Sequence, residues 1–573
     1  MIPDQVRAPG AGRRSGAGLQ PDFPFDYARY ASFDAPLASL PEEALGRVRV
    51  AVIGAGAAGL CAAFELLRMG VVPVLYEAEH DPDGPGGRRL GGRMHSRRLG
   101  PGDTRAELGC MRFPDTGLLL AQYVDRFSLE RCVFPEAFAD DVAHTTVDVD
   151  GRRIAVSSPE ELFAREPAFR RIHDLWREAL DRVGLTRLQQ DLADRDLKAV
   201  KSRWNHLLEK YETWSFQRFL TDPATAAMDP AQARLFGTAG FGTGGWDAFF
   251  DISAVEMFRL VLTTGEATSY YLSDGSAALA ERWWTTRAER PHDPPASLEE
   301  LHGGTPRGRA RALRTTRDGR VAVTDDEGTV TYPAAVLTPQ PAVIETGIDI
   351  PRTGPGAPFG RRLRSALRAG VPWPSAKIVS VSEPFWRGTG MDGVTLTDTT
   401  PRCVYTLPPP GGDGPGVLGL GYTWGRDATK LAASSLDERL DLHLRELTRI
   451  FPELADRIRD HVTAGNTFTV SWENEPNFRG ICRFVRPGEY AMQRDLAAHF
   501  TKSVPGEPAD NLFLAGDAVS FSAGWLDHAL TSALNAVWGV AHALGGDDFP
   551  GNPGPGRLWH HPDYAPWTPD DAH

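Results

Sequence analysis

Residues 50–67, VAVIGAGAAGLCAAFELL, constrain the fold more than any other stretch of this chain. A largely apolar run over residues 48–53 is typical of a buried parallel strand. It leads into three glycines with the spacing G-x-G-x-x-G, and an apolar helix is predicted over residues 57–69. A second predicted strand, VPVLYE, covers residues 72–77 and ends in Glu77. This order of strand, glycine turn, helix and strand predicts a βαβ unit with a parallel sheet.

Each of the three glycines has its own physical role in such a turn. Gly54 allows the tight turn, Gly56 lets the backbone approach a pyrophosphate, and Gly59 lets the helix pack closely on the strand. The helix N-terminus near Ala58 favours the negative charge of phosphates, and Glu77 is placed to bind ribose hydroxyls. We therefore predict a site for FAD or NAD rather than NADP, because the acid favours an unphosphorylated ribose. The alternative is a chance glycine-rich turn with a solvated Glu77.

Length and composition exclude several other classes of protein. A chain of 573 residues is too long for one simple core, so two or three interlocked domains are expected. The formal net charge of −13 argues against a nucleic-acid partner, which needs a basic face. Five scattered cysteines fit a reducing cytoplasm rather than a disulfide framework, and their spacing predicts no metal site. Because neither a secretory signal nor an apolar stretch of about 18 residues is seen, we expect a cytoplasmic protein without a membrane span.

Two later segments add to the first motif. One, GGRMHSRRL, begins at Gly91. The other, LFLAGDAV, places Asp517 directly after a predicted strand at residues 511–514 and ahead of an apolar helix predicted over residues 529–544. An acid at that position can accept hydrogen bonds from the hydroxyls of a cofactor. The alternative for Asp517 is a helix N-cap.

In this order, the three segments resemble those of the flavin-containing amine oxidase family, in its bacterial branch of L-amino-acid oxidases and tryptophan or phenylalanine 2-monooxygenases. The resemblance covers roughly residues 47–545 and includes AELGCMRFP (106–114), SAKIVSVSEPFW (375–386) and SAGWLDHALTSA (522–533). It implies an α/β fold with a discontinuous Rossmann-type FAD-binding domain, a mixed-sheet substrate domain and a helical domain. It also implies FAD, which we expect to be non-covalent because no cysteine lies near residues 522–525.

The resemblance assigns cofactor contacts to a set of positions in this chain. They are Gly54, Gly56, Ala58, Gly59, Glu77, Gly92, Arg93, Met111, Arg112, Gly516, Asp517, Trp525 and Leu526. Three features depart from the family's pattern. Cys110 stands where the branch usually has a small residue, and residues 273–279 are a weakened form of the family's Gly-Gly segment. A basic, glycine-rich loop at residues 302–310 leaves the local adenine contacts open.

The arginine of the MRFP segment, here Arg112, holds the α-carboxylate of the substrate in this branch. A planar guanidinium binds a carboxylate through two parallel hydrogen bonds, a geometry that lysine cannot copy. The alternative is an internal salt bridge to a structural acid such as Glu107. This arginine distinguishes amino-acid oxidases from amine oxidases, whose substrates carry no carboxylate.

The resemblance assigns further catalytic positions. Lys377 matches a lysine that holds a water at flavin N5 and aids the reaction with oxygen; otherwise it is a solvated lysine at a strand end. Tyr405, on a predicted strand, shares the carboxylate with Arg112 or is an ordinary core tyrosine. The Gly524 carbonyl would accept a hydrogen bond from the substrate amine, and Trp525 would wall the pocket unless it is simply part of the core.

The expected function is FAD-dependent oxidation of an L-amino acid, by hydride transfer from Cα to flavin N5 and reoxidation by O2. The products would be a 2-keto acid, ammonia and H2O2, with an amide from oxidative decarboxylation as a second product. Trp525, Trp246 and Phe241 indicate a bulky or aromatic substrate. Alternatives are a main 2-monooxygenase activity, an amine oxidase or desaturase of the same fold, a flavin-binding protein without turnover, and an NAD-dependent dehydrogenase. We expect a homodimer.

The expected domains interlock along the chain. Helical periodicity over much of residues 172–220 predicts a helical domain above the substrate entrance. The last residues are expected to run over the surface without regular structure. The expected segments are an N-terminal extension (1–46), FAD-binding parts (47–115, 275–345 and 503–545), a helical domain (116–240), substrate-domain parts (241–274 and 346–502) and a C-terminal tail (546–573).

Overall fold

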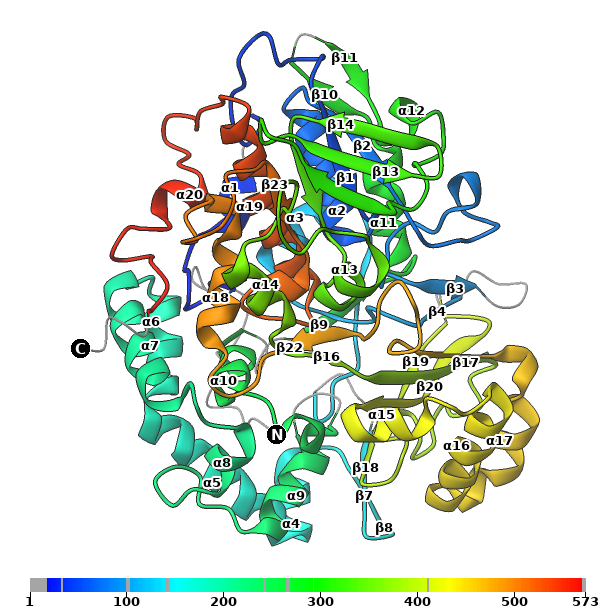
Figure 1. Cartoon of the computed structure of the whole chain (residues 1–573). Coiled ribbons are helices and arrows are strands. Elements are labelled where there is room, and N and C mark those ends of the chain that lie inside the picture. Colours follow the sequence, from blue (N-terminus) through cyan, green and yellow to red (C-terminus); the bar gives the residue numbers. More distant parts are fainter. Residues whose placement is uncertain are drawn as a thin grey trace.

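The computed structural model describes residues 18–31, 35–98, 104–139, 144–240, 244–263, 268–291, 293–409 and 412–568. Within them the chain forms three main parts, seen in Figure 1. A parallel sheet with its helices lies in the upper half of the view, a group of helices lies at the lower left, and a mixed sheet lies at the lower right. This α/β architecture confirms the predicted fold class.

The parallel sheet carries the glycine turn. Its strands come from three widely separated parts of the chain, as expected for a discontinuous Rossmann-type domain. The turn leads into α2 (Ala57–Arg68). The strand order is β2 (Val72–Tyr76), β1 (Arg49–Ile53), β15 (Ala335–Leu337) and β23 (Leu512–Leu514), all parallel.

Both faces of the parallel sheet are buried. Side chains alternate between the two faces along β1, and each face packs in its own core. Val50 and Val52 belong to the core shared with α2 and α19 (Leu526–Ala543). Ala51 and Ile53 pack in a second core with an antiparallel sheet. That sheet consists of β12 (Ala312–Thr315), β13 (Val321–Asp325) and β14 (Gly328–Tyr332). Burial on both faces explains why β1 reads as an unbroken apolar run.

The mixed sheet has seven strands, and one of its pairs is parallel. Only β18 and β7 run parallel among its neighbouring described strands. α16 (Leu436–Ile450) and α17 (Ala455–His461) share its outer core. The strand order is β21 (Thr467–Ser471), β17 (Ser375–Ser382), β20 (Gly416–Trp424), β19 (Cys403–Leu407), β18 (Gly393–Thr397), β7 (His144–Val149) and β8 (Arg152–Val156).

The hairpin of β7 and β8 corrects one expectation. It lies within residues 116–240, which we expected to be helical, and it joins the mixed sheet instead. Its turn is Asp150-Gly151, with φ of +51° and +72°. Asp-Gly between two runs of β-branched residues is a strong hairpin signal that outweighs the helical periodicity further along.

The helical group follows that hairpin. Asp196 and Ser215 cap two of its helices by accepting hydrogen bonds from Ala199 N and Arg218 N. No helix in the described ranges has the length and apolarity needed to cross a bilayer. The helices are α4 (Pro159–Arg165), α5 (Pro167–Val183), α6 (Leu185–Ala193), α7 (Leu197–Tyr211), α8 (Phe216–Thr221), α9 (Pro230–Ala239) and α10 (Ala254–Thr263).

The two terminal segments pack on the rest of the molecule. The Asp22 carboxylate is buried, pairs with Arg259 at 2.8 Å and accepts a hydrogen bond from Trp204 Nε1 at 3.0 Å. The C-terminal tail forms the short helix α20 (Pro555–Leu558), and the ring of Trp559 lies 4.8 Å from that of Phe23. The expectation of a tail without regular structure is therefore wrong for residues 555–558. The buried side chains of Trp559 and Trp567 hold the tail against the rest of the molecule.

Short sheets and further helices complete the described fold. The short sheets pair β3 (Ser96–Arg98) with β4 (Arg105–Glu107), β16 (Val371–Trp373) with β22 (Cys482–Phe484), β10 (Ala288–Arg290) with β11 (Asp293–Ala296), and β9 (Ser269–Leu272) with both β5 (Phe113–Pro114) and β6 (Arg131–Val133). The further helices are α1 (Tyr27–Ala31), α3 (Leu118–Arg126), α11 (Ala277–Thr285), α12 (Leu298–Leu301), α13 (Pro341–Gly347), α14 (Arg361–Arg368), α15 (Gly425–Leu431) and α18 (Tyr490–Ala498).

Candidate active site

The turn between β1 and α2 has the geometry that its glycines predict. Gly54 has a φ of +101°, and its N–H donates to the Tyr76 carbonyl at 2.8 Å. A Cβ atom on Gly59 would lie 1.8 Å from the Gly54 carbonyl oxygen, so a larger residue would push α2 away from the turn. The first turn of α2, which includes Ala58, has no side-chain cap and no acidic residue. Its N–H groups are therefore available to an anion.

The GGR loop lies directly on this turn. Gly91 N–H donates to the Ala55 carbonyl at 2.8 Å, and a Cβ atom on Gly92 would lie 3.1 Å from Gly56 Cα. Gly54 and Gly56 are partly exposed although most of their neighbours are buried. A dinucleotide can therefore reach the backbone here, and the residues present fit such a cofactor.

The carboxylate of Glu77 is held beside the glycine turn. Its Oε2 accepts a hydrogen bond from Ala55 N–H at 2.7 Å, and its Oε1 accepts one from Glu79 N–H at 2.6 Å. Burial raises the pKa of Glu77, and these two hydrogen bonds oppose the rise. The acid thus lies beside the glycine turn, and its binding of a ribose stays a prediction.

The basic loop at residues 302–310 runs along β2. Arg307 N–H donates to the Leu75 carbonyl at 2.8 Å, and Glu77 N–H donates to the Arg307 carbonyl at 3.0 Å. The His302 ring accepts a hydrogen bond from Leu75 N–H at 2.9 Å. The loop therefore extends the edge of the parallel sheet next to Glu77.

Arg93 and Asp517 join two distant segments that the resemblance assigns to the cofactor. The Arg93 guanidinium pairs with both carboxylate oxygens of Asp517 and also donates to the Ile481 carbonyl. Asp517 follows Gly516, whose φ is +122°, and its Oδ2 also accepts from Gly524 N–H at 3.4 Å. Asp517 is therefore an ion-pair partner here, and the alternative of a helix N-cap does not apply.

Lys377 is buried within β17 and is not a solvated lysine at a strand end. Its Nζ donates to the carbonyls of Glu107 and Gly109 at 3.1 and 3.0 Å, and it lies 5.0 Å from the centre of the Tyr422 ring. Burial lowers the pKa of Lys377 to about 8, although the charge of Glu107 opposes the shift. An ammonium has one more N–H than these two carbonyls use, so a further acceptor such as a water can bind.

Arg112 lies just before β5 and pairs with Glu136. Its guanidinium carbon is 5.6 Å from the centre of the Trp525 ring and 6.0 Å from that of Phe134. The side chains of Arg112 and Glu136 are 17% and 16% exposed. An internal salt bridge is therefore present, but with Glu136 rather than with Glu107.

Glu107 has other partners. Its carboxylate accepts hydrogen bonds from Ser96 Oγ at 2.7 Å and from the N–H and Oγ of Ser276 at 2.6 and 2.7 Å. Burial raises the pKa of Glu107, and these hydrogen bonds oppose the rise. Serines rather than an arginine hold this acid in place.

Two tyrosines of the mixed sheet differ in their relation to Arg112. Tyr405 on β19 is buried, and its ring lies 5.3 Å from that of Phe134. Tyr422 on β20 is partly exposed and pairs in register with Lys377. Burial raises the pKa of Tyr422, and the charge of Arg112 is the largest influence opposing that rise. We did not expect Tyr422 from the sequence, where the alternating GLGYTW pattern was the available signal.

The start of α19 contributes the other predicted residues. Gly524 is exposed with a φ of +87°, and Trp525 is partly exposed. Leu526 and Met111 are buried. A Cβ atom on Gly524 would lie 3.7 Å from Cys482 Sγ, so a cysteine distant in sequence lies close to this segment.

The other aromatic residues expected near the substrate are placed less directly. The ring of Trp246 lies 5.9 Å from that of Phe249 and 6.4 Å from that of Phe216, between the helical group and the mixed sheet. Phe241 lies outside the described residues. The catalytic roles of the predicted residues stay predictions.

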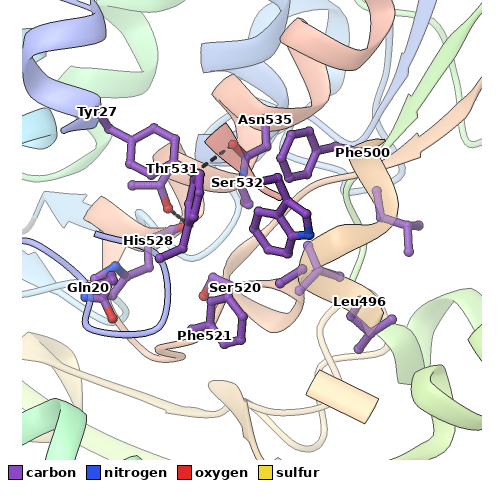
Figure 2. Close-up of a pocket in the computed structure, with 15 residues that line it drawn as sticks. Gln20, Tyr27, Leu496, Phe500, Ser520, Phe521, His528, Thr531, Ser532 and Asn535 are labelled. Atoms are coloured by element: carbon purple, nitrogen blue, oxygen red, sulfur yellow. Dashed lines mark hydrogen bonds between the residues drawn. The ribbon is translucent and has the colours of Figure 1, made fainter. Parts of the chain in front are cut away.

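A separate cavity of about 30 Å³ lies between the N-terminal segment and α19 (Figure 2). Gln20 and His528 line it, with Gln20 Nε2 and His528 Nε2 3.2 Å apart. Its lining includes none of the predicted site residues. Its volume suits a single water molecule rather than a substrate.

The structure combines glycine loops, whose backbone can contact a dinucleotide, with a second sheet, whose side chains can contact a substrate. This combination is typical of a nucleotide-dependent oxidoreductase. The chain belongs to the flavin containing amine oxidoreductase family, whose model matches residues 57–541. It is therefore a flavin-dependent oxidoreductase, and the predicted family is confirmed.

Individual proteins of known name resemble this chain in sequence or in fold. The chain is 28% identical over 544 residues to tryptophan 2-monooxygenase of Pantoea agglomerans pv. gypsophilae, a match that covers 88% of this chain and 90% of that protein. It is 25% identical over 516 residues to the flavin-dependent L-tryptophan oxidase of Lentzea aerocolonigenes, covering 86% and 98%. A double mutant of putrescine oxidase shares the fold, with a TM-score of 0.63, 18% identity and coverage of 87% of this chain and 99% of that one.

Proposed function

We propose that this enzyme oxidises an L-amino acid with a bulky or aromatic side chain, with FAD as its cofactor and O2 as its second substrate. The observation that carries the proposal is the partly buried guanidinium of Arg112 beside two aromatic rings. A permanent cation there can bind a carboxylate, and the rings of Trp525 and Phe134 favour a flat apolar side chain nearby. The names of the tryptophan-oxidising relatives support the same substrate class.

Orientation is the main task of the protein in this scheme. When bound, FAD supplies the redox chemistry by accepting a hydride from the substrate Cα. Arg112 would bind the α-carboxylate, and the Gly524 carbonyl would accept a hydrogen bond from the amine. Two anchors on one substrate hold its Cα in a single place, which lowers the entropic part of the barrier. Lys377 would use its remaining N–H to hold a water.

We propose that FAD is held without a covalent bond. The thiol of Cys482 lies near Gly524, but burial raises its pKa well above the usual value. A neutral thiol is a poor nucleophile. Acid precipitation should therefore release all of the flavin into the supernatant.

The homodimer and the cytoplasmic location expected from the sequence belong to the same proposal. Sedimentation of the purified enzyme tests the first, and cell fractionation tests the second.

An amine oxidase is the second candidate, and one observation favours it. Glu136 already balances the charge of Arg112, as it would if the arginine were purely structural. An amine without a carboxylate would then react at least as well as the amino acid that shares its side chain.

The product distinguishes two versions of the main proposal. We propose oxidative deamination as the main reaction, because amide formation requires that peroxide stay trapped beside the imino acid. The tryptophan 2-monooxygenase relatives favour the amide as a second product. Mass spectrometry of a single turnover with a peroxide assay tests this order. Stoichiometric amide without free peroxide would reverse it.

The decisive test of the function is an anaerobic screen for flavin bleaching. Each of the common L-amino acids is compared with the amine that lacks its carboxylate. Bleaching by a bulky amino acid but not by its amine supports the main proposal. Bleaching by amines alone supports the second candidate, and no bleaching by either would exclude both.

A further inference from the structure

The pairing of Arg112 with Glu136 depends on the short sheet around β9. Arg112 directly precedes β5, and Glu136 follows β6. Both strands pair with β9, where Tyr270 lies opposite Phe113 on one side and Val133 on the other. The strand register therefore holds the two charged side chains on segments that flank β9 on opposite sides.

Glu136 binds only one of the three nitrogen atoms of the Arg112 guanidinium. Its Oε1 accepts a hydrogen bond from Nη1, and in the described part of the chain no other protein atom accepts one from Arg112. The guanidinium carries further donors on Nε and Nη2, in the same plane. Because the rings of Trp525 and Phe134 lie within 5.6 and 6.0 Å of its central carbon, they restrict how the guanidinium can turn.

We propose that Glu136 is a positioning residue for the carboxylate of the substrate, an inference that rests on the proposed function. By holding Nη1, it makes Arg112 present its Nε–Nη2 edge in one orientation, ready for a bidentate pair. Without Glu136, the long arginine side chain samples other rotamers and has to be ordered when the substrate binds, which weakens binding. Glu136 also keeps the partly buried charge paired before the substrate arrives.

A competing role for Glu136 predicts the opposite sign. If Glu136 occupied the place of the substrate carboxylate, it would have to leave before binding, and its removal would strengthen binding. A stand-in for an α-carboxylate would take two nitrogens of the guanidinium. The single contact at Nη1 favours positioning.

The test compares Glu136→Ala, Glu136→Gln and a control, Glu130→Ala, in the flavin-loaded enzyme. Glu130 is exposed and lies just before β6, so its variant should behave like the parent. The ligands are the amino acid that bleaches the flavin fastest and its decarboxylated amine, used as a substrate or competitive inhibitor. Glu136→Ala should raise KM for the amino acid about tenfold, change kcat less than about twofold, and leave the affinity for the amine unchanged. Glu136→Gln keeps an acceptor oxygen and should recover most of the loss.

Binding of phenylacetate, followed through the flavin absorbance, gives a readout that needs no turnover. Its Kd should rise in Glu136→Ala by the same factor as KM. A lower KM, a lower Kd or unchanged values would overturn the positioning role. If Glu136→Ala loses flavin or unfolds at a lower temperature, the smaller rise in KM expected for Glu136→Gln decides in its place.

A third variant separates this inference from the proposed function. If Arg112→Met leaves KM for the amino acid unchanged, the proposed function fails. If Arg112→Met raises KM while neither Glu136 variant does, only the positioning role fails.

Discussion

The proposed cofactor seat offers mainly backbone to a ligand, whereas the proposed substrate face offers long charged and aromatic side chains. We define the seat as the loops around Gly54, Gly59 and Gly92, and the substrate face as Arg112 and Lys377 with their aromatic neighbours. In the seat, added Cβ atoms on Gly59 and Gly92 would come within 1.8 and 3.1 Å of other backbone atoms. On the substrate face, both cations are buried or partly buried and bonded to protein acceptors. Cofactor binding at the seat should therefore be sensitive to the volume of a substituted side chain, and substrate binding at the face should be sensitive to its charge.

The two arginines that mark these regions show the same difference. Arg93 binds both oxygens of Asp517 and a carbonyl, so its donors are largely used within the protein. Arg112 binds one oxygen of Glu136 and keeps further donors. A fully engaged arginine holds segments together, while a partly engaged one can still bind a ligand.

Gly59→Ala should have the largest effect and should act on the seat alone. Its methyl group would lie 1.8 Å from the Gly54 carbonyl oxygen, so α2 has to move away from the turn. We expect purified protein with almost no bound flavin, measured as the ratio of flavin to protein absorbance. Gly465→Ala is the matched control, because its Cβ meets only Thr463 Oγ1 at 3.7 Å. Full flavin content in Gly59→Ala would show that the turn tolerates added volume, and would contradict the contrast between seat and face.

Arg112→Met should be the next largest change and should act on the substrate face alone. Loss of the charged partner should cost about 2–5 kcal/mol of binding free energy and lower kcat/KM for the amino acid by the corresponding factor, with flavin content unchanged. Arg112→Lys keeps the charge but not the bidentate geometry and should fall between this variant and the parent. Steady-state kinetics with the amino acid and its amine measure the effect. Equal losses for both ligands would mean that the arginine is structural.

Lys377→Met should have a smaller effect, confined to the reaction with oxygen. Burial lowers the pKa of Lys377 to about 8, so the side chain is charged below that pH and neutral above it. If the charge promotes reoxidation, the rate of flavin reoxidation in the parent falls as the pH rises through about 8. The variant should reoxidise roughly 10- to 100-fold more slowly, without that pH dependence. Stopped-flow measurement of both half-reactions is the check, and equal slowing of the two would remove Lys377 from this role.

Tyr422→Phe and Tyr405→Phe should have the smallest effects, and their order tells which of the two tyrosines lies nearer the bound carboxylate. Because Arg112 influences the pKa of Tyr422, we expect this hydroxyl to lie nearer the carboxylate. Tyr422→Phe should raise KM about two- to tenfold, the range for one hydrogen bond, and Tyr405→Phe should change it less. The reverse order would place the carboxylate on the side of Tyr405, as the family resemblance implied.

Much of the fold could be predicted because its signals are local. The apolar run before Gly54, the helix after it and the acid at Glu77 lie where the sequence placed them. α16 likewise follows local signals, because its amphipathic pattern and its capping box at Ser435 lie within one short segment. The Asp-Gly turn of the β7–β8 hairpin is visible in the sequence, but the helical periodicity that follows it favours the prediction of a helical domain over this stretch.

The glycine turn and the kinds of residue around Arg112 and Lys377 can be recognised from the sequence alone. Glycine spacing and strand alternation are properties of a few neighbouring residues, so no distant contact is needed to recognise them. The folded structure adds three facts: Glu136 is the acid that pairs with Arg112, Lys377 is buried, and Tyr422 lies beside Lys377. These facts depend on the register of strands such as β5, β9 and β6, and on how deeply each charge is removed from water. Register and burial arise from packing between segments far apart in the chain, and no local pattern encodes them.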